Sequence, residues 1–212
     1  MEMQKDYAPN VVCGLMRIGG YSCGILADQP SFMAGTLDVH GSEKASRFVK
    51  TIHKLGLPII VLTDTPGFLP GKDQEHHNLL LKGAALFKAF ENANVPVLSF
   101  ILRKAYGGAY IVMAAKSVGN RFCYMWKDAR IGVMQEDAAI EVLYKKDLLL
   151  HPDDPALREK YKEEYLSELP DMESLVEAGY FDGVVEPSET RNTIIDRLQT
   201  MDMPPENGRS LG

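Results

Sequence analysis

A run of small residues, Gly107-Gly108-Ala109, follows an apolar stretch and precedes a segment of helical character. Residues this small leave the backbone N–H groups uncovered, and the first N–H groups of a helix lack internal acceptors. The positive potential at the start of a helix adds to their attraction for negative charge. The pattern therefore predicts a corner that receives an oxyanion through backbone donors alone. The alternative is that the glycines only permit a tight turn between strand and helix.

A second segment, Asp64-Thr65-Pro66-Gly67, fits the DxxG element of GTP-binding proteins. That element works together with a phosphate-binding loop of the pattern GxxxxGK[ST], which the chain lacks. The nearest stretch, Gly67 to Asp73, has the wrong spacing and places an aspartate where a magnesium-binding hydroxyl is needed. We therefore do not expect nucleotide hydrolysis.

The remaining reactive side chains indicate neither a metal site nor a hydrolase. His76 and His77 are adjacent, and neighbouring residues on a helix point about 100° apart, so we expect both on the surface. The chain has no HExxH pattern and no GxSxG pattern. Glu136 and Asp137 have two interpretations, acid–base chemistry or capping of a helix that begins at Ala138. We favour capping, because acidic residues suit the start of a helix.

The composition is that of an ordinary globular protein. The 212 residues contain 45% hydrophobic and 25% charged side chains, which excludes fibrous and wholly disordered classes. The formal net charge is -6, and no block of basic residues interrupts it. A nucleic-acid partner is therefore not expected.

The cysteine pattern and the N-terminus predict a cytoplasmic protein. There are three cysteines and no CxxC pair, which argues against a disulfide framework and a zinc cluster. The stretch Met1 to Pro9 carries acidic residues and no apolar centre, so it does not read as a signal peptide. No run of 18 or more apolar residues suggests a membrane span.

The order of apolar runs and turn residues predicts an α/β fold, in which sites lie in loops beyond the strand ends. Gly19-Gly20 joins two apolar runs as a hairpin turn, and Ser42 and Gly56 are expected to cap a helix between them. A closing helix is expected to begin after Ser188. The predicted strands are 11–18, 21–27, 57–63, 95–102, 122–126 and 131–134, and the predicted helices are 42–55, 74–92, 138–145, 155–169 and 188–198. The helix at 155–169 is charged, and we expect it to pack as a strut on the core or on another subunit.

Five segments follow one another in an order that is more specific than any of them alone. They are Ala27-Asp28-Gln29-Pro30, Ser42 to Phe48 (SEKASRF), Asp64 to Gly71 (DTPGFLPG), Arg103 to Tyr110 (RKAYGGAY) and Glu186 to Arg191 (EPSETR). With these segments the chain resembles the carboxyltransferase component of biotin-dependent acyl-CoA carboxylases, of the propionyl-CoA carboxylase β-subunit type. The resemblance covers the C-terminal half of that family's two-domain chain.

The resemblance implies a crotonase-like (ClpP/crotonase) fold, a spiral of ββα units, with residues 1–202 as one domain. Residues 203–212 are rich in Pro, Gly and polar side chains, and we expect them to form a flexible tail. It implies carboxyl transfer between biotin, carried as carboxybiotin on a carrier protein, and the α-carbon of an acyl-CoA. This half would receive carboxybiotin, and a separate half would bind most of the CoA. The implied partners are the biotin carboxyl carrier protein, biotin carboxylase, the CoA-binding half and further copies in a trimer or hexamer.

The resemblance also assigns roles to residues near the glycine corner. The backbone N–H groups of Gly108 and Ala109 would face the biotin oxygen on which negative charge develops. The reaction would need no side-chain base, because the ureido anion itself can take the proton. Ile111 would form an apolar wall of the acyl pocket, and its alternative is an ordinary core position. The implied cofactor-binding residues are Gly67, Phe68, Tyr106 and Gly107.

One stretch departs from the family pattern. Where the family commonly has Met-Gly and further small residues, this chain has Met134-Gln135-Glu136-Asp137. Two carboxylates beside an anion-stabilising site oppose its task unless they point away. Three alternatives therefore stay open: a non-catalytic scaffold, a biotin-dependent acyl-CoA decarboxylase subunit, or a free-standing enoyl-CoA hydratase or isomerase that uses Glu136.

Overall fold

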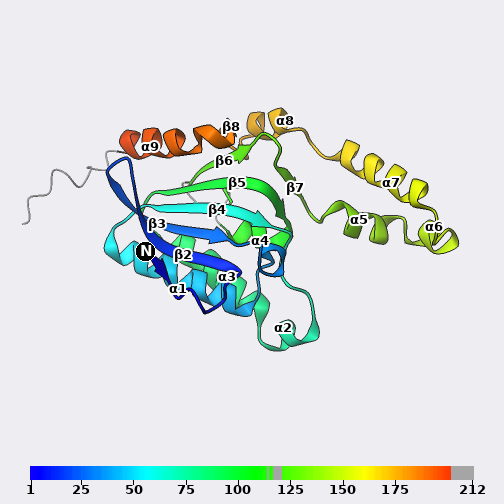
Figure 1. Ribbon diagram of the computed structural model, residues 1–212, viewed down its shortest axis with the longest axis horizontal. Coiled ribbons are helices and arrows are strands. Elements are labelled where there is room, and N and C mark those ends of the chain that lie inside the picture. Colours follow the sequence, from blue (N-terminus) through cyan, green and yellow to red (C-terminus); the bar gives the residue numbers. More distant parts are fainter. Residues whose placement is uncertain (114, 117–120, 202–212) are drawn as a thin grey trace, which may run out of the picture.

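The structure, a computed structural model, describes residues 1–113, 115–116 and 121–201. It consists of a twisted sheet with helices on both faces and a helical arm that extends to one side (Figure 1). The tail predicted for residues 203–212 lies outside the described residues.

Within the described ranges the sheet has eight strands, in the order β1-β2-β3-β4-β5-β6-β8, with β7 paired to β5. The strands up to β3 pair antiparallel, and all later pairings are parallel. The predicted α/β class is thereby confirmed. The strands are β1 (Glu2–Met3), β2 (Val11–Ile18), β3 (Tyr21–Asp28), β4 (Ile59–Thr65), β5 (Val97–Tyr106), β6 (Arg121–Trp126), β7 (Arg130–Gly132) and β8 (Gly183–Val185).

Helices fill most of the connections between these strands. The turn at Gly19-Gly20 is confirmed, with φ of 57° and 90° at the two glycines. The helices are α1 (Val39–Leu55), α2 (Lys72–His76), α3 (Leu79–Glu91), α4 (Gly107–Val112), α5 (Glu136–Leu143), α6 (Lys145–Leu150), α7 (Pro155–Glu168), α8 (Met172–Glu177) and α9 (Thr190–Thr200), with short 3₁₀ turns at Met33–Gly35 and Pro187–Glu189.

Two hydrophobic layers form on opposite faces of the sheet, because successive side chains of a strand point to opposite faces. Along β4, Ile59 and Val61 pack with α1 and α3, whereas Ile60 packs with α9. Figure 1 shows α1 and α3 on one face of the sheet and α9 across the other. The parallel strands are thus covered on both sides, which explains their nearly continuous apolar sequence.

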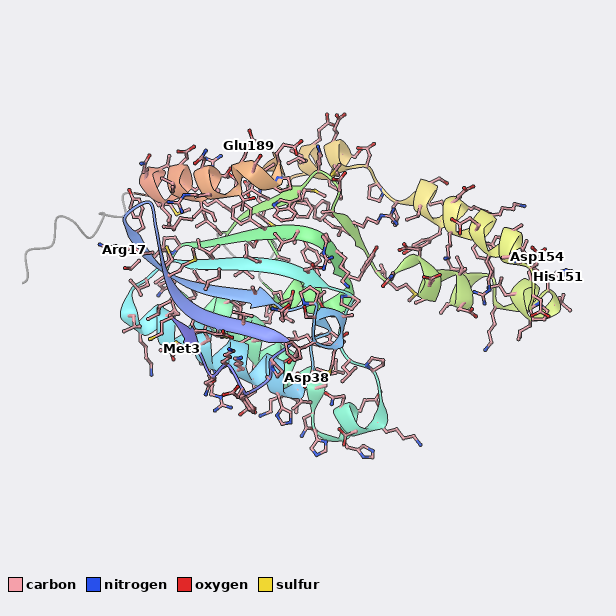
Figure 2. All side chains as sticks on the ribbon, in the orientation of Figure 1. Met3, Arg17, Asp38, His151, Asp154 and Glu189 are labelled. Atoms are coloured by element: carbon pink, nitrogen blue, oxygen red, sulfur yellow. The ribbon has the colours of Figure 1, made fainter. Side chains whose placement is uncertain are left out.

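The start of α1 lies three residues earlier than predicted, and Ser42 is not its cap. Asp38 is the N-cap residue, and its carboxylate accepts a hydrogen bond from the Gly41 N–H at 2.7 Å (Figure 2). Ser42 is fully buried inside the helix, and its Oγ finds no partner among the described residues. The predicted end at Gly56 is confirmed, since this residue adopts the left-handed conformation.

The position of the cap leads to a stability prediction. Asp38→Ala should lower the free energy of unfolding by about 1–2 kcal/mol, because the Gly41 N–H loses its acceptor. Ser42→Ala should leave it nearly unchanged, because the hydroxyl that it removes is already unsatisfied. Urea unfolding of both variants tests the assignment. If Ser42→Ala lowered the free energy of unfolding more than Asp38→Ala, the cap would be Ser42 and not Asp38.

The prediction of a single helix over residues 74–92 is wrong. The structure has α2 and α3, separated by Asn78, which adopts a φ of 63°. A left-handed residue cannot continue a right-handed helix, and the polar stretch before it offers no apolar stripe that packing could hold. His76 and His77 are exposed, as predicted.

The strands β4 and β5 extend further toward the glycine corner than predicted. Thr65 pairs with Ala105, so the Asp64 and Arg103 regions belong to strands and not to loops. The register shifts between Thr63 and Thr65, an irregularity centred on Asp64. Such irregularities re-aim side chains beside functional sites.

The helices α5, α6 and α7 form the arm of the molecule. Figure 1 shows them extending away from the sheet, and Figure 2 places His151 and Asp154 at the far tip. No residue of α7 is buried. The predicted helix is thus confirmed, but it does not pack on the core of its own chain.

The last helix is also capped differently from the prediction. Ser188 lies inside the 3₁₀ turn that precedes α9. The turn is closed instead by a capping box, in which the Glu186 N–H donates to the Glu189 carboxylate at 3.3 Å.

Candidate active site

The glycine corner is the junction at which β5 ends and α4 begins. Tyr106 is the last strand residue and Gly107 the first helical one. Gly107 adopts a φ of 60°, and a Cβ at this position would lie 3.1 Å from the carbonyl oxygen of Val133. Both the backbone angle and the neighbouring chain therefore require glycine here.

The backbone donors predicted at this corner are left without helical acceptors. Gly107, Gly108 and Ala109 are the first three residues of α4, and N–H groups at these positions have no partner four residues earlier. None of the loop, turn or cap hydrogen bonds recorded between described residues is donated by the three. Gly108 is exposed, whereas Ala109 is fully buried as a whole residue and does not line the cavity described next.

A cavity of about 850 Å³ opens at this corner. Its wall comes from α4, β7 and the residues after α8, and it includes Gly107, Gly108, Ile111, Lys116, Val133 and Tyr180. Three of the predicted site residues, Gly107, Gly108 and Ile111, thus line one cavity. Ile111 is 45% exposed, so its side chain faces this space and not the core.

Phe68 supports the corner from behind and does not line this cavity. Its ring is wedged between two glycines: a Cβ at Gly83 would lie 2.7 Å from the ring, and one at Gly108 would lie 3.2 Å from it. The ring also borders a second cavity of about 530 Å³ beside α2 and α3. Gly67 directly precedes Phe68. A Cβ built at Gly67 would lie 4.0 Å from the carbonyl oxygen of Tyr106.

Tyr106 is buried and its side chain points to β7 and α5. The hydroxyl donates a hydrogen bond to the Glu136 carboxylate at 3.4 Å, and the ring packs on Gly132. Burial, with the Glu136 charge as a smaller contribution, raises the pKa of Tyr106 to about 12. The phenol therefore stays protonated at neutral pH and holds the end of β5.

Glu136 and Asp137, the two carboxylates in the stretch that departs from the family pattern, are both paired with cations. Glu136 accepts from Arg130 at 3.0 Å, and Asp137 lies 2.6 Å from Lys162. They are the first two residues of α5, and the N-cap Gln135 makes no side-chain cap hydrogen bond. The predicted capping role is wrong, because both carboxylates are directed to side-chain partners. Neither residue lines the large cavity.

Three further wall residues, Lys116, Val133 and Tyr180, were not found from the sequence. The Lys116 ammonium lies 2.9 Å from the Asp182 carboxylate, which also accepts from the Cys123 N–H at 2.8 Å. The three wall residues come from separate segments spread over more than 60 positions of the chain, and only the folded sheet brings them together. No local pattern in the sequence could have signalled them.

Among the described residues, no helix has both the length and the apolar character needed to cross a membrane.

The fold and the cavity define a crotonase-like half-domain of the carboxyltransferase type. The structure superimposes on a crystal structure of transcarboxylase 12S, solved with methylmalonyl-coenzyme A and methylmalonic acid bound, with a TM-score of 0.85. That match has 34% identity and covers 100% of this chain and 40% of the other. Residues 1–207 also match the family model described as carboxyl transferase domain. The chain belongs to the carboxyl transferase domain family.

Two curated relatives define the extent of the similarity. The propionyl-CoA carboxylase carboxyltransferase subunit of Haloferax mediterranei is 43% identical over 199 residues, which are 94% of this chain and 39% of that protein. The methylmalonyl-CoA decarboxylase subunit alpha of Propionigenium modestum is 35% identical over 202 residues, 95% of this chain and 39% of that protein. The chain thus spans about 40% of the length of the relatives that it matches.

Proposed function

We propose that this chain is the carboxybiotin-binding half of a biotin-dependent acyl-CoA carboxyltransferase in the cytoplasm, with residues 1–202 as one half-domain. The observation that carries the proposal is the exposed Gly108 backbone on the wall of an 850 Å³ cavity. Family membership supplies the class of reaction, and the corner supplies donors where such a reaction develops charge on oxygen.

The residues present fit the bound group that the proposal requires. A Cβ at Gly107 would lie 3.1 Å from the carbonyl oxygen of Val133 on the cavity wall and so narrow the space, and backbone N–H groups are suitable donors to a ureido oxygen. Among the described wall residues, Lys116 alone is charged, and Asp182 already pairs with it. When bound as carboxybiotin, the cofactor supplies the carboxyl group that is transferred.

The chain's own residues bind and orient the cofactor, and they exclude water from it. The N–H groups of Gly108 and Ala109 would hold the cofactor oxygen, where bound carboxybiotin would place negative charge during transfer. Phe68 fixes these donors by packing under Gly108, and Tyr106 fixes the preceding strand through Glu136. We assign Gly107, at the turn, and Gly67, in the loop after β4 and close to the Tyr106 carbonyl oxygen, to the cofactor side of the same corner.

Ile111 is assigned to the acyl side of the cavity. It is 45% exposed and lies in α4, two residues after Ala109. Val133 and Tyr180, which are 78% and 60% exposed, extend the apolar rim. An exposed apolar rim around a cavity marks a surface that another chain covers. We propose that the CoA-binding half covers it and delivers the acyl-CoA.

The arm supports assembly into a larger complex. Four of its apolar side chains are more than 60% exposed, namely Val142, Leu143, Leu149 and Leu150. The solved transcarboxylase 12S relative is described as a hexamer assembly. We propose a trimer or hexamer of this chain with its CoA-binding half, served by a biotin carboxyl carrier protein and biotin carboxylase.

Two alternatives are less well supported. A free-standing enoyl-CoA hydratase or isomerase would need Glu136 at the thioester, but this carboxylate is held by Arg130 and Tyr106 and does not line the cavity. A scaffold that excludes biotin would need the carboxylates of Glu136 and Asp137 to enter the cavity, and both are paired elsewhere. The third alternative, a decarboxylase subunit, would use the same site to move the carboxyl group from the acyl-CoA to biotin.

Reconstitution tests the proposal. The chain, a CoA-binding half, carboxybiotin and propionyl-CoA should together yield carboxylated thioester, and omission of either protein should abolish transfer. Assaying methylmalonyl-CoA with biotin under the same conditions measures the decarboxylase direction. Absence of transfer in both directions, together with no saturable binding of biotin methyl ester to the chain, would reject the proposal.

A further inference from the structure

A pair of buried carboxyl groups lies at the ends of β3 and β4, outside the large cavity. Asp28 is 7% exposed and Asp64 is 3% exposed. The Asp64 N–H donates to Oδ2 of Asp28 at 2.9 Å. The Oδ1 atoms of both residues are buried and have no hydrogen-bond partner among the described residues. A buried carboxylate that is only partly hydrogen-bonded is costly, which singles out this pair.

The two carboxyl groups differ in their access to positive charge. Arg103 on β5 donates from Nε to Oδ2 of Asp64 at 2.6 Å, so the Asp64 carboxylate is balanced. Asp28 has no such direct partner among the described residues, and the charges that act on it are Asp64 from β4 and Lys104 from β5. Burial, more than the Asp64 charge, raises the pKa of Asp28 to about 7.

The pair also fixes the backbone that leads to the candidate site. Asp64 lies at the irregularity of β4, which ends at Thr65, and the 66–68 loop that follows carries Phe68. Within this loop the Gly67 carbonyl accepts from the Leu37 N–H at 3.0 Å, and the Leu69 N–H donates to the Leu37 carbonyl at 2.9 Å. Asp64 and Phe68 thus belong to one short segment, whose far end is tied to Leu37 by these two backbone hydrogen bonds.

We propose that Asp28 is a protonation-dependent positioning residue, whose neutral carboxyl group holds Asp64 and the 66–68 loop beneath Gly108. Above neutral pH it releases its proton to solvent, and two carboxylates then share one buried site with Arg103. Repulsion and lost hydration loosen the end of β4 and the loop that follows. The proposal does not depend on the reaction assigned to the cavity.

The sign of the pH dependence follows from linkage. Asp28 is protonated in the folded chain and ionised in the unfolded chain between its ordinary pKa of 3.8 and about 7. The folded state then holds one more proton, so stability falls as pH rises through this window and levels off above it. Asp28→Asn keeps an acceptor for the Asp64 N–H and has no proton to lose.

Urea unfolding between pH 4.5 and pH 8 tests the stability part. The folding equilibrium constant of the native sequence, divided by that of Asp28→Asn, should fall about tenfold per pH unit up to about pH 6.5 and then flatten. Asp171→Asn is the matched control, because Asp171 is an exposed cap that accepts from the Ser174 N–H at 2.7 Å. Its ratio to the native sequence should stay constant over the range. A constant ratio for Asp28→Asn would overturn the proposal.

One further measurement separates positioning from stability alone. The protection factor of the Leu69 amide, divided by that of the Ile52 amide in the core helix α1, should decrease as pH rises through 7 in the native chain and stay constant in Asp28→Asn. Unchanged Leu69 protection would reject the positioning role. If Asp28→Asn does not fold, a ¹³C NMR titration of the native Asp28 carboxyl group decides, since a midpoint below pH 5 would contradict the proposal.

Discussion

Gly108→Pro is expected to lower the rate of carboxyl transfer by the reconstituted enzyme by about two to three orders of magnitude. Proline removes the backbone N–H that we assign to the cofactor oxygen. The same N–H has no helical acceptor, because Gly108 is the second residue of α4. Proline is tolerated in the first turn of a helix, so the fold should survive the substitution.

The matched control for this variant is Gly108→Ala. Alanine brings the same Cβ to 3.2 Å from the Phe68 ring but keeps the N–H group. It should retain kcat within about tenfold of the native value, because the ring can shift by a few tenths of an ångström. Steady-state rates of both variants, with circular dichroism as a check on folding, separate the donor from the steric effect. Equal rates for proline and alanine would remove Gly108 from the catalytic assignment.

Lys44→Met is expected to lower the free energy of unfolding by about 3 kcal/mol or more. Lys44 is 1% exposed, yet its ammonium has no carboxylate partner within bonding distance among the described residues. It donates instead to three backbone carbonyls, those of Tyr7 at 2.7 Å, Ala8 at 3.2 Å and Val11 at 2.6 Å. Methionine fills a similar volume but leaves these acceptors unsatisfied.

Lys50→Met provides the control for the lysine variant. Lys50 is exposed on the same helix, and its substitution should change stability by less than about 0.5 kcal/mol. Urea unfolding gives both values, and hydrogen exchange of residues 7–11 shows whether the N-terminal segment detaches. A Lys44→Met variant as stable as Lys50→Met would show that the three hydrogen bonds contribute nothing net.

The parts of the fold that the sequence predicted are those with strong local signals. The hairpin turn at Gly19-Gly20 and the helix end at Gly56 depend on backbone angles that glycine adopts readily. The alternation of strands and helices follows from apolar periodicity, because each element must bury a face. The corner at Gly107 was predicted for the same reason, since strand, small residues and helix are adjacent in the chain.

Features that depend on contacts between distant segments escaped prediction. Asp38 caps α1 instead of Ser42, and both residue types are suitable caps, so only the folded position decides. Glu136 was expected to cap α5, but Arg130 and Tyr106 reach it from neighbouring strands. In the sequence, Asp28 and Asp64 appear only as polar residues near the ends of two separate strands. Parallel pairing of β3 with β4 brings them together.

The central claim is that the Gly108 and Ala109 amides bind the oxygen of the biotin ring. Titration of the ¹⁵N-labelled chain with biotin methyl ester, followed by amide correlation spectra, tests it most directly. The account predicts saturable downfield shifts of these two amide protons, with lesser changes around the cavity. Saturable binding that leaves both amides unmoved would contradict it.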